Sequence, residues 1–90
     1  MIFKDLEKTI SERQKTEQAN SYTYRLLTED FLVERKVSEE CFEVVEASFK
    51  KDKNGLINEA CDLIYHLMVL LRKSDISLLE LEKELMRRRR

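Results

Sequence analysis

The sequence predicts an all-α protein, an antiparallel bundle of four to five helices in a single domain over residues 1–90. Ninety residues hold one hydrophobic core and are too few for a Rossmann sheet or a TIM barrel. Proline is absent and glycine occurs once, whereas an all-β chain needs many turn residues. Apolar side chains recur every three or four positions, which is the helical period, and charged side chains fill the remaining surface.

The N-terminal part of the chain is expected to form one helix and a short helical segment. The first helix is predicted over residues 2–16 from the spacing of Ile2, Phe3, Leu6 and Ile10. The polar stretch 14–20 has no apolar stripe and is expected to be a connection or a frayed helix end. Residues 21–27 are predicted to be a short turn or helix.

Two long helices, over residues 29–51 and 56–73, are predicted to form the centre of the bundle. The buried stripe of the first is expected to consist of Val33, Val37, Cys41, Val44 and Ser48. Asn54-Gly55 is the expected helix breaker in the turn 51–55. The buried stripe of the second is expected to consist of Leu56, Ala60, Leu63, Ile64, Leu67, Leu70 and Leu71.

A last, shorter helix is predicted to run to about Arg87. Residues 74–76 interrupt the preceding helix, and Ser77 with Glu80 forms a capping box that starts the next one. The basic end, residues 87–90, is expected to be a frayed tail that the helix dipole favours.

The predicted helix 56–73 carries a second apolar stripe on its other side. At about 100° per residue, this stripe contains Ile57, Cys61, Tyr65 and Met68. A helix that is apolar on two sides is buried on two sides, and so few helices hardly cover both. We therefore expect a homodimer that buries the second stripe. The alternative is a compact monomer in which the first helix covers it.

Composition excludes several classes of protein. The net charge is −1, whereas dedicated nucleic-acid binders usually carry a large basic excess. Two cysteines do not form a disulfide framework. The first residues alternate charged with apolar side chains, unlike a signal peptide, and the longest mostly apolar run, 63–71, is about half of a membrane span. We expect a soluble cytoplasmic protein with no nucleic-acid or membrane partner.

Two acidic pairs occupy matching positions in the predicted hairpin. Glu40 and Glu43 are spaced i, i+3, and so are Glu59 and Asp62, so each pair projects from one helix face. Glu40 and Asp62 are equidistant from residue 51, and so are Glu43 and Glu59. An antiparallel hairpin therefore brings all four carboxylates to the same level, at the margin of the buried faces.

Such a cluster is expected to bind a divalent cation, because half-buried carboxylates repel one another and lose hydration. Oxygen ligands without thiolate or imidazole favour Mg²⁺, with Mn²⁺ possible, and Mg²⁺ keeps positions for water and phosphate. The pattern therefore indicates phosphate chemistry. One alternative is a set of solvated surface carboxylates. A di-iron site is the other, but its Glu-x-x-His motif is missing because Leu63 precedes His66 by three positions.

The sequence around these carboxylates resembles a known family. The resemblance lies in Ser21-Tyr22-Thr23 before Leu26-Leu27, in the run 36–45 and in the run 59–71. These stretches are similar to phosphoribosyl-ATP pyrophosphohydrolase, the second enzyme of histidine biosynthesis. That family belongs to the all-α nucleotide pyrophosphohydrolases, with MazG-type enzymes and dimeric dUTPases. The superfamily hallmark, E-x-x-E followed by E-x-x-D, is matched by Glu40, Glu43, Glu59 and Asp62.

The resemblance implies Mg²⁺-dependent hydrolysis of phosphoribosyl-ATP to phosphoribosyl-AMP and pyrophosphate. The metal would be held by Glu40, Glu43, Glu59 and Asp62, and it would gather the triphosphate oxygens. Glu39 and Glu40 are the candidate catalytic residues, Glu39 as the group that orients or deprotonates the attacking water. The alternatives are a related house-cleaning nucleoside triphosphate pyrophosphohydrolase and a non-enzymatic, acidic helical dimer.

Five further side chains are candidates for substrate binding: Lys36, Tyr22, Thr23, Arg25 and His66. Tyr22 and Thr23 rest on the resemblance alone. Arg25 and Lys36 are expected to hold the ribose 5-phosphate that distinguishes phosphoribosyl-ATP from ATP.

Two of these candidates also have a structural interpretation. Lys36 precedes Glu39 and Glu40 by three and four positions, which is equally typical of a surface ion pair of small energetic value. His66 follows Asp62 by four positions, so it is expected either to hydrogen-bond Asp62 or to contact substrate.

Overall fold

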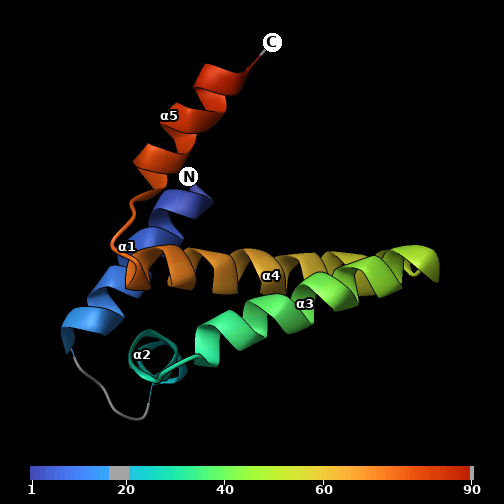
Figure 1. Cartoon of the computed structure of the whole chain (residues 1–90), viewed down its shortest axis with the longest axis horizontal. Coiled ribbons are helices and arrows are strands. Elements are labelled where there is room, and N and C mark those ends of the chain that lie inside the picture. Colours follow the sequence, from blue (N-terminus) through green and yellow to red (C-terminus); the bar gives the residue numbers. More distant parts are fainter. Residues whose placement is uncertain (17–20, 90) are drawn as a thin grey trace.

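The computed structural model describes residues 1–16 and 21–89 and is helical throughout that part, apart from turns (Figure 1). The helices are α1 (Ile2–Thr16), α2 (Tyr22–Thr28), α3 (Leu32–Phe49), α4 (Lys53–Lys73) and α5 (Leu78–Arg88). The predicted all-α class is therefore confirmed. The connection predicted over residues 14–20 lies partly outside the described residues, and α1 runs through its first part.

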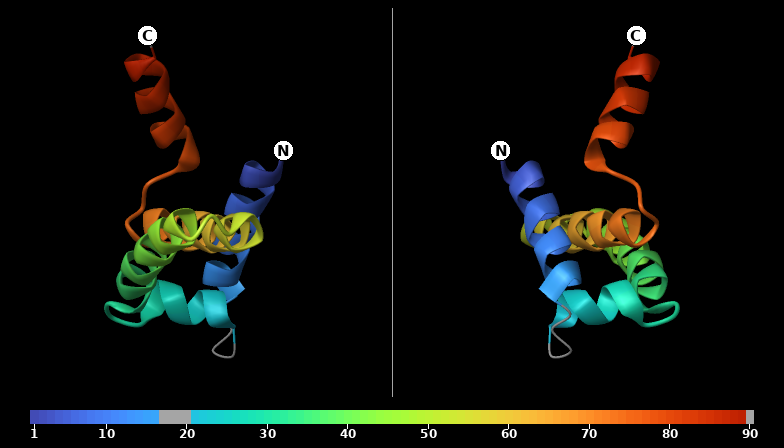
Figure 2. Two further views of the ribbon diagram at one scale, coloured as in Figure 1. Left: turned by 90° about the vertical axis from the view of Figure 1, so that its right-hand side faces the viewer. Right: turned by 90° about the vertical axis from the view of Figure 1, so that its left-hand side faces the viewer.

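The helices α3 and α4 form a long antiparallel hairpin, and the other helices gather at its open end (Figures 1 and 2). There α1 packs against α2 and α4, and α2 packs against both α3 and α4. The last helix, α5, points away from this group. None of the described helices is both long enough and apolar enough to cross a membrane.

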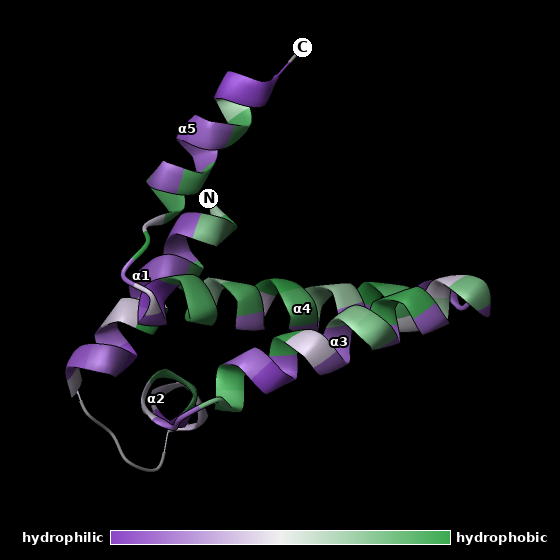
Figure 3. Ribbon diagram, viewed as in Figure 1, coloured by the Kyte–Doolittle hydropathy of each residue, from purple (hydrophilic) through white to green (hydrophobic). Residues whose placement is uncertain are grey.

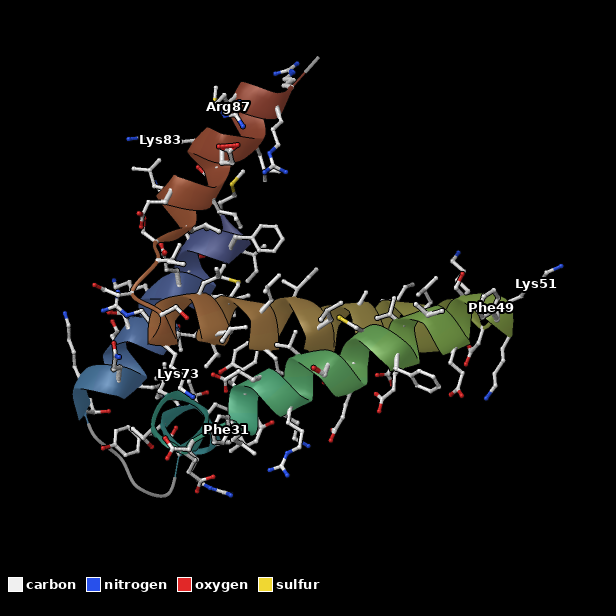
Figure 4. The ribbon with its side chains drawn as sticks, viewed as in Figure 1. Phe31, Phe49, Lys51, Lys73, Lys83 and Arg87 are labelled. Atoms are coloured by element: carbon white, nitrogen blue, oxygen red, sulfur yellow. The ribbon has the colours of Figure 1, made fainter. Side chains whose placement is uncertain are left out.

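The hydrophobic core lies where α1, α2, α3 and α4 meet. Its most deeply buried side chains come from all four helices: Ile10, Leu26, Val33 and Val69. The apolar residues of α4 extend well beyond this junction toward the outer end of the hairpin (Figure 3). At that outer end Phe49 is 83% exposed, and Lys51 points into solvent (Figure 4). The hairpin is thus anchored at one end only within the described chain.

The long helix predicted from residue 29 begins at Leu32. The Glu29 amide instead donates to the Arg25 carbonyl at 2.8 Å and ends α2. Phe31 then adopts a left-handed φ of 65°, which turns the chain into α3 without a capping side chain. Periodicity misses this boundary because the turn is made by backbone geometry, not by glycine or proline.

The prediction that Asn54-Gly55 breaks the chain is wrong, because both residues lie in the first turn of α4. The chain reverses at Lys51, whose φ is 55°, and Asp52 caps α4 by accepting the Gly55 amide at 3.0 Å. A Cβ at position 55 would stand 2.2 Å from Oδ2 of Asp52. Glycine is therefore used here for the close approach of the capping carboxylate.

The capping box predicted at the start of α5 is present. Ser77 accepts the Glu80 amide, and the Glu80 carboxylate accepts the Ser77 amide at 2.8 Å. A third contact comes from α1, because Glu7 accepts the Leu78 amide at 2.6 Å. None of the residues of α5, all of them described, is buried.

The predicted buried stripe of α3 is wrong at two positions, because Cys41 and Ser48 are exposed. The inner stripe instead combines Val33, Val37, Glu40, Val44 and Ala47. Its spacing alternates four and three residues, the period of a helix that stays in contact with one neighbour. A stripe drawn through the apolar residues alone leaves out Glu40, although this side chain is buried and only 7% exposed.

The predicted second stripe of α4 is also only partly right. Met68 is buried in the core and Tyr65 is half-buried, because the inner face of α4 is centred on His66 and Val69. The prediction that Ile64 and Leu67 are buried is wrong, because both are exposed. The apolar side chains left exposed along α4, which we call the open stripe, are Ile57, Cys61, Ile64 and Leu67. The homodimer is predicted to cover the second stripe, of which only Ile57 and Cys61 are exposed, and it stays a prediction.

Candidate functional site

The hairpin places the four predicted carboxylates on two facing helices. Glu40 and Glu43 lie on α3, and Glu59 and Asp62 lie on α4. The Glu59 carboxyl is within hydrogen-bonding reach of Glu43, and the charges of Asp62 and Glu40 also act on it. The structure therefore brings all four into one electrostatic group, as their spacing about residue 51 predicts.

Glu59 is the carboxyl group of the four whose ionisation is clearly disfavoured by its surroundings. Its pKa is raised from 4.5 to about 7. The largest cause is that a proton on Glu59 can be shared with Glu43, followed by burial and by the repulsion from Glu43, Asp62 and Glu40. Its Oε2 atom is buried and has no hydrogen-bond partner within the described chain. A carboxylate in this situation needs a proton or a cation.

This donor set fits a hard divalent cation. Carboxylate oxygens are the ligands that Mg²⁺ and Mn²⁺ prefer, and the orphaned Oε2 of Glu59 is the kind of atom that a cation satisfies. In the part of the chain that the structure describes, no three His, Cys, Asp or Glu side chains converge as a ready-made metal site. The side chains face one another across the hairpin without surrounding a common point.

An open groove of about 310 Å³ runs beside the carboxylates toward the hairpin turn. Glu43 and Glu59 line it, together with Glu46, Lys50 and Asp52. Four acidic side chains against one lysine make its surface negative. A polyanion therefore enters this groove only together with cations.

Glu40 is buried and its carboxylate pairs with Nδ1 of His66, whereas the sequence predicts Asp62 or the substrate as the partner of His66. Asp62 is exposed and makes no such contact. The reason is that Glu40 and His66 are both buried on the inner faces of α3 and α4, whereas Asp62 is exposed. A lone histidine beside an apolar stripe thus has a buried acidic partner on the neighbouring helix.

Tyr22 and Thr23 of α2 contact two consecutive residues of α4. The Tyr22 hydroxyl lies 2.8 Å from Nε2 of His66, and Thr23 hydrogen-bonds to the Tyr65 hydroxyl. Thr23 is buried, so its hydroxyl has no open path to a ligand in this arrangement. Burial and the nearby charge of Glu40 raise the pKa of Tyr22, which therefore keeps its proton at neutral pH.

The remaining candidates lie on the surface. Lys36 pairs with Glu39 at 3.7 Å, and Arg25 pairs with Glu29 at 3.1 Å. All four side chains are between 38% and 52% exposed, so neither ion pair contributes much to stability and both cations are accessible to a ligand. Tyr65, which belongs to the run 59–71 that carries the resemblance, also lies beside this site and contacts Thr23 and the ring of His66.

Comparisons with known proteins identify the family to which the sequence is similar. Residues 3–89 match the family described as phosphoribosyl-ATP pyrophosphohydrolase. A phosphoribosyl-ATP pyrophosphatase of Pyrobaculum islandicum is 42% identical over 90 residues, which cover 99% of this chain and 96% of the relative. One from Clostridium acetobutylicum is 41% identical over 97% of this chain and 80% of the relative.

A longer relative also matches. The histidine biosynthesis bifunctional protein HisIE of Staphylococcus epidermidis is 43% identical over 92% of this chain, which spans only 40% of that protein. Two independent kinds of comparison, with a family and with individual proteins, thus give the same result over nearly the full sequence. The chain belongs to the phosphoribosyl-ATP pyrophosphohydrolase family.

Proposed function

We propose that this protein hydrolyses phosphoribosyl-ATP to phosphoribosyl-AMP and pyrophosphate, a step of histidine biosynthesis, in the cytoplasm. Family membership supports the reaction, and the names of the relatives support the substrate. The observation that carries the proposal is the buried Oε2 of Glu59, which lies within a group of four carboxylates and has no hydrogen-bond partner among the described residues. Such a group is costly to fold and is suited to hold a cation against a polyphosphate.

The residues that would hold the metal are Glu40, Glu43, Glu59 and Asp62. Mg²⁺ fits their oxygen donors, and Mn²⁺ is the natural substitute. When bound, the ion supplies positive charge to the triphosphate oxygens and to the leaving pyrophosphate, and it acidifies a water molecule.

The other side chains would bind and orient the substrate and the water. Glu39 is half-exposed next to Glu40 and is our candidate to orient the attacking water or take its proton. Lys36 and Arg25 would exchange their surface carboxylate partners for phosphate oxygens, with which they also form charge-assisted hydrogen bonds. Tyr22 and His66 would act at the inner end of this site through Glu40, and the buried Thr23, also a predicted substrate ligand, would support them by holding α2 on α4.

A homodimer is the proposed working form. The open stripe of α4 is apolar and exposed in the described chain, with Ile57 at 51% and Ile64 at 40%. A second copy of the chain would bury it, and it runs along the helix that carries Glu59 and Asp62.

The direct test is pyrophosphate release from phosphoribosyl-ATP, ATP and dUTP in the presence of Mg²⁺. We expect phosphoribosyl-ATP to be strongly preferred. Glu43→Gln and Asp62→Asn should each lower turnover by about 100-fold or more while the helical circular dichroism is kept. Glu46→Gln, in the same groove, should stay close to wild type.

Each contrary result has a definite meaning. Equal turnover of all three nucleotides would establish a broad nucleoside triphosphate pyrophosphohydrolase instead. Near-normal turnover in both Glu43→Gln and Asp62→Asn would show that these carboxylates do not hold a metal ion needed for the reaction.

A further inference from the structure

His66 connects three helices through both of its ring nitrogens. Nδ1 contacts Oε1 of Glu40 on α3, and Nε2 lies 2.8 Å from the Tyr22 hydroxyl on α2. The rings of Tyr22 and Tyr65 pack edge-on against the imidazole, with centroids 5.7 and 5.8 Å away. His66 is only 7% exposed. The ring is therefore fixed in both position and rotation.

When the imidazole is neutral, the hydrogen bonds that join Tyr22, His66 and Glu40 have one consistent set of donors and acceptors. An ionised Glu40 only accepts hydrogen bonds, so Nδ1 of His66 must donate. Nε2 then carries a lone pair and accepts the hydroxyl proton of Tyr22. Glu40 thus selects the tautomer, and the Tyr22 hydroxyl supports it by donating to the nitrogen that carries the lone pair.

We propose that Tyr22 and His66 are positioning residues that set how Glu40 presents its carboxylate to the cation. The proposal rests on the proposed function, because Glu40 is one of its metal ligands. The imidazole occupies one lone pair of Oε1, so Oε2 is the less engaged oxygen of Glu40, and Glu40 would bind the ion mainly through Oε2. The hydroxyl of Tyr22 therefore acts on the metal site through two hydrogen bonds without touching it.

The chain offers a matched control for this idea. Thr23 and Tyr65 form a second hydroxyl contact between the same two helices, one residue along from Tyr22 and His66. That contact holds α2 on α4 but reaches neither Glu40 nor an imidazole nitrogen. Tyr22→Phe and Tyr65→Phe each delete one hydroxyl at this junction, and only the first should change the cation site.

The experiment measures Mn²⁺ binding by electron paramagnetic resonance of the free ion, and kcat and KM with Mg²⁺. We expect Tyr22→Phe to weaken Mn²⁺ binding by about three- to tenfold, and His66→Leu by about tenfold or more. Both variants should lower kcat more than they raise KM for phosphoribosyl-ATP. Tyr65→Phe should lower the midpoint of unfolding and leave Mn²⁺ binding at the wild-type level.

A conservative variant separates positioning from simple packing. In His66→Asn the side-chain amide stands near the place of Nδ1 and can still donate to Glu40, but it offers nothing to Tyr22. We expect His66→Asn to recover part of the Mn²⁺ affinity lost in His66→Leu. Adding Tyr22→Phe to His66→Asn should then cause no further loss, since Tyr22 acts only through the imidazole.

The outcomes distinguish this proposal from the proposed function. If the wild type binds Mn²⁺ and hydrolyses the substrate but Tyr22→Phe and Tyr65→Phe bind Mn²⁺ equally well, the positioning role is refuted and the function stands. If Glu59→Gln and the wild type bind Mn²⁺ equally weakly, the metal site and the positioning role are both refuted. Loss of Mn²⁺ affinity in Tyr22→Phe alone supports the proposal.

Discussion

Glu43 and Glu59 face each other across the α3–α4 hairpin, and the proton that they can share raises the pKa of Glu59 to about 7. In the unfolded chain the ordinary value is 4.5. Between these two pH values the folded protein binds more protons than the unfolded chain. The free energy of unfolding of the metal-free protein should therefore decrease as pH rises from about 4.5 to 7.

This pH dependence is measurable by urea unfolding in the presence of EDTA at pH 5 and pH 7.5. We expect a lower midpoint at pH 7.5, and a smaller difference between the two pH values in Glu59→Gln. The pKa values of Glu34, Glu80 and Glu84 are lowered. These groups therefore change the free energy of unfolding mainly below about pH 4.5 and not between pH 5 and pH 7.5. Mg²⁺ should restore stability at pH 7.5 more than at pH 5. An unchanged pH dependence in Glu59→Gln would contradict the assignment.

Arg25 and Lys36 should decide the choice of substrate. Each is a surface cation held by one carboxylate, and a charge-assisted contact to the additional phosphate is worth roughly 1.5–3 kcal/mol. Arg25→Ala and Lys36→Ala should lower kcat/KM for phosphoribosyl-ATP about 10- to 150-fold and leave the background rate on ATP almost unchanged. Arg35→Ala, at an exposed cation one position before Lys36 on α3, is the control for loss of a nearby surface charge. Equal losses on both substrates would show that these cations serve the triphosphate or the fold.

Asp52 and Gly55 should be energetically coupled. Asp52→Ala removes the cap of α4 and should lower the free energy of unfolding by about 1 kcal/mol. Gly55→Ala adds a better helix former but displaces the Asp52 carboxylate, so the two effects should nearly cancel. In the Asp52→Ala background the same change should stabilise the protein, since no cap is left to displace. Urea unfolding of the four proteins tests this, and strictly additive effects would refute the coupling.

The open stripe of α4 should form the dimer interface. Ile57→Glu or Ile64→Glu should convert a species that sediments at about twice 10.8 kDa into one of 10.8 kDa, because a charge would be buried without a partner. Asn58→Glu adds the same charge one position along and is the control. Met68 is unsuitable for this test because it is buried in the core of a single chain, so a charge there would unfold the protein. A monomeric wild type at micromolar concentration would refute the prediction.

Helical period and the spacing of charges predict the architecture well but not the inner face of α3. The matched positions of Glu43 and Glu59 about residue 51 depend only on an antiparallel hairpin, and the structure has one. The burial of Glu40 depends on a partner from α4, which a stripe drawn on one helix does not contain. The pairing with His66 is thus a property of two helices together.

The turn between α3 and α4 shows a second reason for a wrong prediction. Asn-Gly usually marks a reversal of the chain, because both residues tolerate a positive φ. Here the positive φ belongs to Lys51, and Gly55 is used for the space it leaves beside Asp52. A glycine can serve either a positive φ or a close approach by another group. The sequence alone does not tell which of the two Gly55 serves, and the structure shows that it is the close approach.

The absence of buried residues from α5 has a consequence for the exchange of its amide hydrogens with solvent. Its capping box and the contact from Glu7 fix where the helix begins, but an isolated helix of 11 residues is marginal in water. Its amides should exchange by local opening, orders of magnitude faster than those around Val69 in the core. Slow exchange in α5 that appears only at high protein concentration would show that a second copy packs against it.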